Sequence, residues 1–181
     1  MFERYTERAR RVIFFARYEA SSYGSHTIET EHLLLGLGRE DKNFLRYFAL
    51  SEGDLLSKVE ALITKKPKIS TSIDLPLTDE CKRILAYANE EAERLNHRHI
   101  GTEHLLLGML RESGCLAARV LGEAGVELVA LRDELAKSVV DRSDPPPGDA
   151  FPADRSFLHE LVDRLPESVL GRAHSMLKQL L

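Results

Sequence analysis

One seven-residue segment occurs twice in this chain, and it limits the fold more than any other feature. The sequence Thr-Glu-His-Leu-Leu-Leu-Gly stands at residues 30–36 and again, letter for letter, at residues 102–108, an offset of 72 positions. Self-similarity at a fixed offset is the signature of a tandem repeat, in which each copy is one supersecondary unit. We therefore expect two repeat units, at about residues 2–63 and 74–136.

Both predicted units begin with the same helical pattern. Thr6 is expected to cap a first helix whose apolar residues recur at helical spacing and which stops at Gly24, a residue suited to the left-handed conformation. Thr78 takes the same place in the second unit. Thr30 and Thr102 are expected to cap the second helices, which are apolar most of the way round and should be buried.

The remaining segments of the two units predict an all-α fold. Third and fourth helices are expected at residues 44–50 and 54–63 in the first unit and at residues 115–121 and 126–137 in the second. No segment shows sustained alternation of apolar and polar residues, so we expect no sheet of consequence. The predicted architecture is two tandem four-helix repeats related by a pseudo-twofold axis.

The chain beyond the repeats predicts a smaller, separate part. We assign residues 1–140 to the repeat domain, residues 141–153 to a proline-rich linker and residues 154–181 to a C-terminal helical hairpin. Consecutive prolines favour an extended conformation, and a hairpin of this size cannot bury its leucines alone. The hairpin therefore either packs on the repeat domain or forms a homodimer. We favour the homodimer, because the linker holds the hairpin away from the repeats.

Charge and composition exclude several classes of protein. The 181-residue chain has a net charge of −4 and no basic run, so we expect no nucleic acid as a partner. No apolar segment approaches the roughly 20 residues needed to span a bilayer, and the amino end lacks the pattern of a signal peptide. We therefore expect no membrane association and a cytoplasmic location. Cys81 and Cys115 lie far apart on apolar stripes and are predicted to be core residues rather than a disulfide or zinc ligands.

No pattern in the chain indicates catalysis or a bound metal. The sequence contains neither a Gly-x-x-x-x-Gly-Lys-Ser/Thr phosphate loop nor a Gly-x-Ser-x-Gly motif. His97, His99 and His104 form a group, but their spacing matches no zinc motif and no paired cysteine accompanies them. We expect no catalytic residue, no metal and no cofactor, and we expect His32 and His104 to be buried and hydrogen-bonded.

The doubled segment, its offset and the opening sequence Phe-Glu-Arg-Tyr-Thr-Glu-Arg-Ala at residues 2–9 resemble the amino-terminal double-repeat domain of bacterial Clp unfoldases, ClpC most closely. The resemblance covers about residues 1–140. It implies an all-helical domain that receives substrates and adaptor proteins in front of the ATPase rings. Because the phosphate loop is missing, the resemblance predicts a non-catalytic protein- or peptide-recognition module. Its expected partners are Clp unfoldases, adaptors or client proteins, and it would act as an adaptor, a decoy or a regulator of Clp proteolysis.

The resemblance also implies candidate binding residues. In ClpC-like members this domain recognises arginine-phosphorylated proteins, and the glutamate of each doubled segment contacts the guanidinium side of phosphoarginine. The corresponding residues are Glu31 and Glu103, although an acidic residue in a first turn is also favourable for the helix dipole alone. The threonines expected near the phosphate are Thr6, Thr78, Thr30 and Thr102. A face that binds proteins or cyclic peptides would include Phe2, Lys82 and Leu77, the last in a position where an aromatic residue is usual.

Two departures from the family pattern bear on these sites. The usual Thr-Pro-Arg at the start of the second unit is here Thr-Asp-Glu at residues 78–80, which places two anions near an expected phosphate site. The first copy also has Glu29 where the second has Gly101. The alternative function is that of a structural or regulatory protein that oligomerises through the hairpin at residues 154–181.

Overall fold

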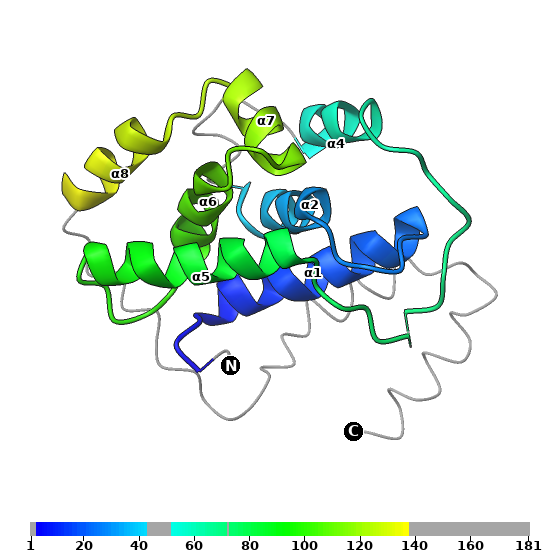
Figure 1. Ribbon diagram of the computed structural model, residues 1–181, viewed down its shortest axis with the longest axis horizontal. Coiled ribbons are helices and arrows are strands. Elements are labelled where there is room, and N and C mark those ends of the chain that lie inside the picture. Colours follow the sequence, from blue (N-terminus) through cyan, green and yellow to red (C-terminus); the bar gives the residue numbers. More distant parts are fainter. Residues whose placement is uncertain (1–2, 43–51, 72, 138–181) are drawn as a thin grey trace. The chain divides into compact units, whose positions relative to one another are not determined.

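The computed structural model describes residues 3–42, 52–71 and 73–137 of the chain (Figure 1). These residues contain no strand, and the predicted all-α class is confirmed. The helices are α1 (Glu7–Tyr23), α2 (Thr30–Glu40), α4 (Glu52–Glu60), α5 (Asp79–Arg94), α6 (Thr102–Arg111), α7 (Leu116–Glu123) and α8 (Leu128–Lys137). The helix expected at residues 44–50, the linker at residues 141–153 and the hairpin at residues 154–181 lie outside the described residues.

The predicted pseudo-twofold relation between the repeats is visible in their contacts. Helix α1 packs on α2 in the first repeat, and α5 packs on α6 in the second (Figure 1). Two isolated β-bridges join the repeats, Tyr5 with Ile100 and Ile28 with Leu77. Adding 72 to the first-repeat residue of each bridge gives the second-repeat residue of the other bridge, because Tyr5 matches Leu77 and Ile28 matches Ile100. The start of the first helix of each repeat therefore lies beside the second helix of the other repeat.

The core lies along the two doubled segments. Helices α2 and α6 lie between the pair α1 and α5 and the pair α4 and α7 (Figure 1). Their leucines are buried from every side, at 0–7% exposure for residues 33–35 and 105–107. Cys81 and Cys115 are free thiols buried in the same core, which agrees with their predicted role as small apolar residues. None of the described helices combines the length and the apolar content needed to cross a bilayer.

The first helices are capped as predicted. The side chain of Thr6 accepts a hydrogen bond from the N–H of Ala9, and the side chain of Thr78 accepts one from the N–H of Cys81. Gly24 ends α1 with φ at 71°, in the left-handed region where glycine is favoured. The sequence thus predicted both ends of α1 and the start of α5.

The predicted caps of α2 and α6 were wrong by one residue. The N-caps are Glu29 and Gly101, so Thr30 and Thr102 are the first residues inside their helices. The cap lies one residue earlier because of the histidine that stands three residues after it. Its ring nitrogen Nδ1 accepts a hydrogen bond from the N–H of the cap residue, 3.0 Å for His32 and 2.9 Å for His104. Histidine here takes the part that glutamate or glutamine plays in a capping box.

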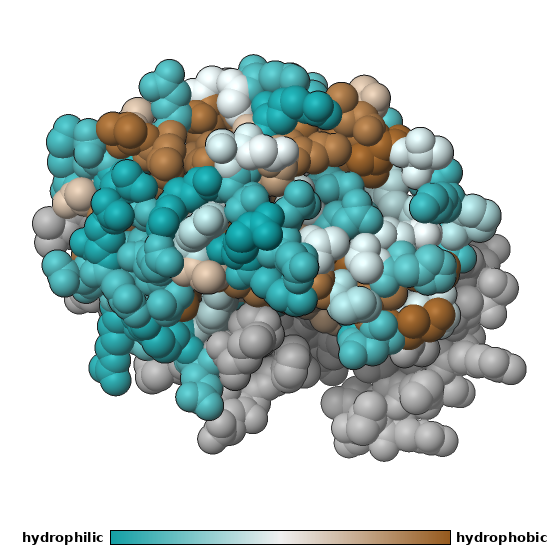
Figure 2. Space-filling view, viewed as in Figure 1, coloured by the Kyte–Doolittle hydropathy of each residue, from teal (hydrophilic) through white to brown (hydrophobic). Residues whose placement is uncertain are grey.

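The surface divides into polar and apolar areas. Hydrophilic side chains cover the face of the molecule over α5, while hydrophobic side chains gather along the edge that α4, α7 and α8 form (Figure 2). Leu56 on α4 is 38% exposed and Val129 on α8 is 63% exposed. On the first repeat, Phe14 and Tyr18 of α1 are also exposed.

Candidate functional site

The bridge between Tyr5 and Ile100 brings the start of α1 to the turn before α6. The N–H of Thr6 donates to the carbonyl oxygen of Ile100 at 3.0 Å, and the N–H of Ile100 donates to the carbonyl oxygen of Arg4 at 2.8 Å. The first turn of α1 therefore lies beside the first turn of α6, which carries Glu103. We call this place the Glu103 site: Gly101, Thr102 and Glu103 together with Thr6, Glu7 and Arg8.

The second bridge builds the equivalent place on the other side of the axis. The N–H of Ile28 donates to the carbonyl oxygen of Pro76 at 2.8 Å, and the N–H of Thr78 donates to the carbonyl oxygen of Ile28 at 3.1 Å. The Glu31 site thus contains Glu29, Thr30 and Glu31 together with Thr78, Asp79 and Glu80. Both sites are composite, since each takes its glutamate from one repeat and its threonine-capped helix from the other. This exchange of elements between the repeats could not be derived from the sequence, because along the chain each glutamate follows the threonine-capped helix of its own repeat.

The four candidate threonines fall into two kinds. Thr6 and Thr78 cap helices at the two sites, with Oγ1 of Thr6 3.2 Å from the N–H nitrogen of Ala9. Thr30 and Thr102 are buried between the repeats instead. Oγ1 of Thr102 donates to Oδ2 of Asp41 at 2.7 Å, and Oγ1 of Thr30 accepts from the N–H of Ala117 at 3.4 Å. The contacts of Thr30 and Thr102 thus join one repeat to the other.

Both buried histidines are held in the neutral state. His32 and His104 are 2% and 1% exposed, and burial lowers the pKa of each to about 4. The N–H of Gly101 donates to Nδ1 of His104, so the proton of that ring sits on Nε2 and is shared with Nδ1 of His97 at 2.9 Å. These rings fix the first turns of α2 and α6, on which the two glutamates stand.

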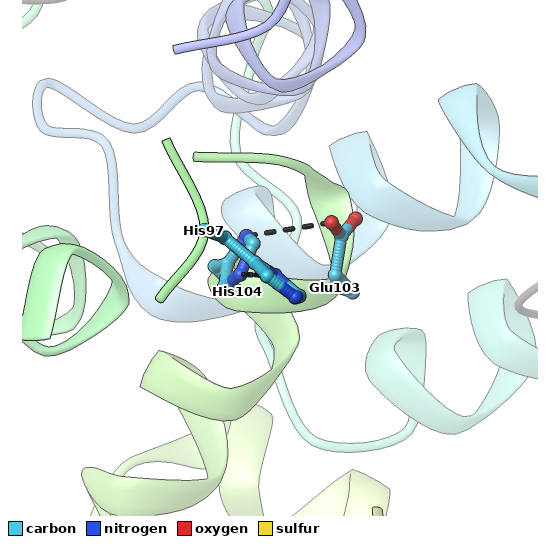
Figure 3. A group of neighbouring side chains, drawn as sticks. All are labelled: His97, Glu103 and His104. Atoms are coloured by element: carbon cyan, nitrogen blue, oxygen red, sulfur yellow. Dashed lines mark hydrogen bonds and ion pairs between the residues drawn. The ribbon is translucent and has the colours of Figure 1, made fainter. Parts of the chain in front are cut away.

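One group of side chains has the composition of a metal site. His97, Glu103 and His104 place ligand atoms within 4.8 Å of one another, and no other such group occurs in the parts of the chain that the structure describes (Figure 3). Oε1 of Glu103 lies 3.4 Å from Nδ1 of His104. An ion on Nε2 of His104 would move the ring proton to Nδ1, where it would face the N–H of Gly101, and an ion on Nδ1 would displace that N–H. The hydrogen bonds of this group therefore favour a helix-capping role over metal binding.

The two glutamates have different surroundings. Glu31 is buried at 7% exposure, whereas the side chain of Glu103 is 23% exposed. Burial, together with a hydrogen bond and the charge of the Glu29 carboxyl group, raises the pKa of Glu31 to about 7. Burial alone would also raise the pKa of Glu29, but hydrogen bonds from Glu31, Ser25 and Thr27 outweigh it and lower that pKa. The sequence showed the difference between Glu29 and Gly101, but it did not place Glu29 among the candidate site residues. Its contact with Glu31 is known only from the structure.

The residues predicted for a peptide-binding face are only partly described. Phe2 lies outside the described residues. Leu77 is half-buried and forms the bridge with Ile28 at the Glu31 site. Lys82 is exposed, and its Nζ lies 2.8 Å from Oδ1 of Asp79 in an ion pair within the first turn of α5. The ammonium group of Lys82 thus partly offsets the acidic charge at that helix end.

The fold and the two composite sites define an all-α domain built from two tandem repeats. The repeats are related by a pseudo-twofold axis, and the first helix of each begins beside the second helix of the other. A sequence model of the family described as the Clp repeat (R) N-terminal domain matches residues 4–111 and 76–169. The chain belongs to this family, and the predicted resemblance is confirmed.

Curated relatives support the same assignment. The chain is 39% identical over 139 residues to the Bacillus subtilis (strain 168) protein named negative regulator of genetic competence ClpC/MecB, a match that covers 75% of this chain and 17% of that protein. It is 37% identical over 148 residues to the chloroplastic chaperone protein ClpC of Pisum sativum, covering 80% of this chain and 16% of that protein. The chain therefore spans about a sixth of the length of these relatives.

A solved structure gives the same result for the fold. The N-terminal domain of the caseinolytic protease associated chaperone ClpD from Arabidopsis thaliana is 30% identical, with a TM-score of 0.61 over 75% of this chain and 96% of that one. The chain is therefore a Clp N-domain, an interaction module by its family.

Proposed function

We propose that this Clp N-domain binds arginine-phosphorylated protein segments without altering them chemically. The observation that carries the proposal is the composite build of the two sites, each of which combines a carboxylate with the N-terminus of a helix from the other repeat. Phosphoarginine carries a guanidinium group next to a phosphoryl group. A carboxylate pairs with the guanidinium in a charge-assisted hydrogen bond, and the first-turn N–H groups of a helix lack intrahelical acceptors and favour anionic oxygens.

The threonine caps support this assignment of roles. The side chains of Thr6 and Thr78 each accept a hydrogen bond from the N–H three residues later. The N–H groups of the first two helical residues are therefore left to bind a ligand. In α1 these are Glu7 and Arg8. The phosphate would therefore be bound by main-chain groups, and Thr6 or Thr78 would hold the helix end in place.

In the cell, the module would work with the Clp machinery. The relatives named ClpC and ClpD are chaperones, and this chain matches them over about a sixth of their length or over their N-terminal domain. We propose that it acts in the cytoplasm as an adaptor, a decoy or a regulator of Clp proteolysis, with an unfoldase, an adaptor or a client protein as partner.

Calorimetric titration with phosphoarginine tests the ligand, with arginine and inorganic phosphate as separate controls. We expect saturable heat from phosphoarginine and little from either part alone, because each part reaches only half of a composite site. Replacing both glutamates, Glu31→Ala with Glu103→Ala, should abolish binding. Glu123→Ala on α7 is the matched control, since Glu123 is an exposed glutamate on a helix outside both sites.

Circular dichroism separates loss of binding from loss of fold. The double glutamate variant should keep the helicity of the parent chain, since both residues stand on the first turns of helices whose leucine cores are unchanged. Equal binding by the parent and the double variant would refute the assignment of these residues. No heat from phosphoarginine with any variant would refute phosphoarginine as the ligand.

A further inference from the structure

The two composite sites differ at one backbone position. Glu29 and Gly101 are the N-caps of α2 and α6, in the same place of each repeat. The side chain of Glu29 is held by two neighbours, with Oε1 3.0 Å from Oγ of Ser25 and 3.2 Å from Oγ1 of Thr27. The second repeat has histidines at those two places and no side chain at Gly101. The first site therefore carries an additional carboxyl group that its counterpart lacks.

At the Glu103 site, the glutamate itself occupies the space that this additional side chain would need. A Cβ atom on Gly101 would lie 2.5 Å from Oε1 and 2.7 Å from Cδ of Glu103. The carboxylate of Glu103 thus lies over the glycine, and part of it remains open to solvent. It makes no hydrogen bond to a second carboxyl group in the described part of the structure. An incoming cation can reach it without first breaking such a bond.

At the Glu31 site, the corresponding carboxyl group is already engaged. Glu31 and Glu29 are joined by a hydrogen bond between their carboxyl groups, which requires one proton between them. Oε2 of Glu31 also accepts from Oγ1 of Thr30 at 3.4 Å. A guanidinium group would have to displace the proton and separate the half-buried Glu29 from the buried Glu31, and both steps oppose binding.

The helix from the other repeat adds a second difference, which also disfavours ligand binding at the Glu31 site. The first turn of α5, beside Glu31, carries Asp79 and Glu80, whereas the first turn of α1, beside Glu103, carries Glu7 and Arg8. Lys82 offsets part of the charge of Asp79, but the two anions at the start of α5 still repel a phosphoryl group more than the mixed pair of α1 does. Because the start of α5 lies beside α2, the acidic first turn of α5 and Glu29 are at the same site, and neither affects the Glu103 site.

We propose that the two sites are not equivalent: Glu103 receives the guanidinium group of the ligand, and Glu29 keeps the Glu31 site closed, so that the chain binds one ligand where its symmetry offers two places. The inference rests on the proposed function and adds the residue that selects between the sites. Glu29 is a specificity-determining residue by this account, because its side chain and not the fold decides which copy of the motif is open.

Isosteric variants at equivalent positions test the inference, with phosphoarginine as the probe and calorimetry as the readout. The parent chain should bind one equivalent. Glu103→Gln should weaken binding by about tenfold or more, since it removes the charge from a charge-assisted hydrogen bond. Glu31→Gln should change the dissociation constant by less than about twofold, because that carboxyl group is not available to the ligand.

A gain-of-function variant tests the role of Glu29 directly. Glu29→Gly combined with Glu80→Arg gives the Glu31 site the same pattern of charges as the Glu103 site, with Asp79 in the place of Glu7, and we expect a second equivalent to bind. Gly101 has φ at −94° and Glu29 has φ at −101°, so the backbone accepts either residue and the variant should fold. Circular dichroism checks that it does.

The outcomes separate the inference from the proposed function. Two equivalents bound by the parent chain, or equal losses in Glu31→Gln and Glu103→Gln, would overturn the inference and leave phosphoarginine binding standing. One equivalent in the Glu29→Gly, Glu80→Arg variant would overturn the role of Glu29. No binding by the parent chain would overturn the proposed function and the inference with it.

Discussion

Gly36 of α2 lies so close to Val12 of α1 that a Cβ atom on the glycine would collide with the carbonyl oxygen of Val12. The same Cβ atom would lie 2.9 Å from the backbone nitrogen of Ala16. In the second repeat, Gly108 stands in the same relation to Ile84 of α5, and a Cβ atom there would lie 3.1 Å from the backbone nitrogen of Ala88. The last residue of each doubled segment is therefore glycine because two helix backbones touch there.

This contact predicts that Gly36→Ala destabilises the domain. The obstructing atoms belong to the backbone of α1, which cannot rotate away as a side chain can, so the two helices would have to separate. We expect a net loss of about 1–3 kcal/mol in the free energy of unfolding, although alanine is the better helix former. Urea unfolding followed by circular dichroism measures the change, and Gly108→Ala should behave alike.

Gly122 provides the matched control. It lies in α7 with open space around it, so alanine meets no atom there. We expect Gly122→Ala to stabilise the domain by about 0.5–1 kcal/mol through helix propensity. Equal effects at Gly36 and Gly122 would contradict the close approach of α1 and α2.

A buried carboxylate attaches α8 to α5 within the second repeat. Glu91 is fully buried, and Arg132 of α8 donates two hydrogen bonds to it, each 2.8 Å long. Helix α8 has no buried residue of its own. We therefore expect Arg132→Ala to loosen α8 and to cost about 1–3 kcal/mol. Hydrogen exchange should show lost protection at residues 128–137. The control Val129→Ala, at a 63% exposed residue of the same helix, should leave that protection unchanged.

The sequence predicted the parts of the fold that depend on local patterns. The 72-residue offset, the caps Thr6 and Thr78 and the left-handed stop at Gly24 are each readable from neighbouring residues, and the structure has them. The caps of α2 and α6 were misplaced because threonine is the commoner cap, and the competing effect is the histidine three residues after Glu29. A histidine that accepts a backbone N–H is not a standard capping signal.

The candidate sites depend on contacts between residues distant in the chain, and these were not predictable. The sequence predicted Glu31 and Glu103 as candidate binding residues, but the pairing of Thr78 with Ile28 decides that the acidic turn of α5 lies beside Glu31. The periodicity of apolar residues shows which face of a helix is buried, but it does not show which repeat packs against that face. The exchange of Glu29 for Gly101 was visible, but its effect on Glu31 follows only from the three-dimensional contact.

The buried histidines predict acid sensitivity. The pKa of His104 is about 4 in the folded chain, below the ordinary value of 6.5, so the unfolded chain binds more protons between these values. Stability from this residue is present above pH 6.5 and is lost as the pH falls toward 4. His104→Gln cannot titrate, and its side-chain oxygen can accept the N–H of Gly101. Between pH 7 and 5 this variant should lose about 2 kcal/mol less than the parent chain, as measured by urea unfolding at each pH.

The exposed His26 serves as the control for this pH dependence. His26→Gln should leave the change in stability between pH 7 and 5 as it is in the parent chain. A His104→Gln variant with the same pH dependence as the parent would show that the ring is not kept neutral by burial.

The carboxyl pair of the Glu31 site predicts a stabilising substitution. The pKa of Glu31 is raised to about 7 by burial and by Glu29, so the folded chain binds more protons than the unfolded chain between about pH 4.5 and 7. The contribution of Glu31 to stability therefore falls as the pH rises through this range, and the loss is complete above pH 7. Glu31→Gln cannot ionise and can donate an N–H to Glu29.

We expect Glu31→Gln to raise the free energy of unfolding at pH 8 by about 1–3 kcal/mol, with a smaller difference at pH 5, where the parent carboxyl group holds its proton. Thermal unfolding followed by circular dichroism at the two pH values measures this. Glu103→Gln is the matched control and should change stability by less than about 0.5 kcal/mol at either pH, because its carboxylate is partly open to solvent. If both variants shifted the melting temperature equally at pH 8, the carboxyl pair of Glu29 and Glu31 would not exist in solution, and the first site would be as open as the second.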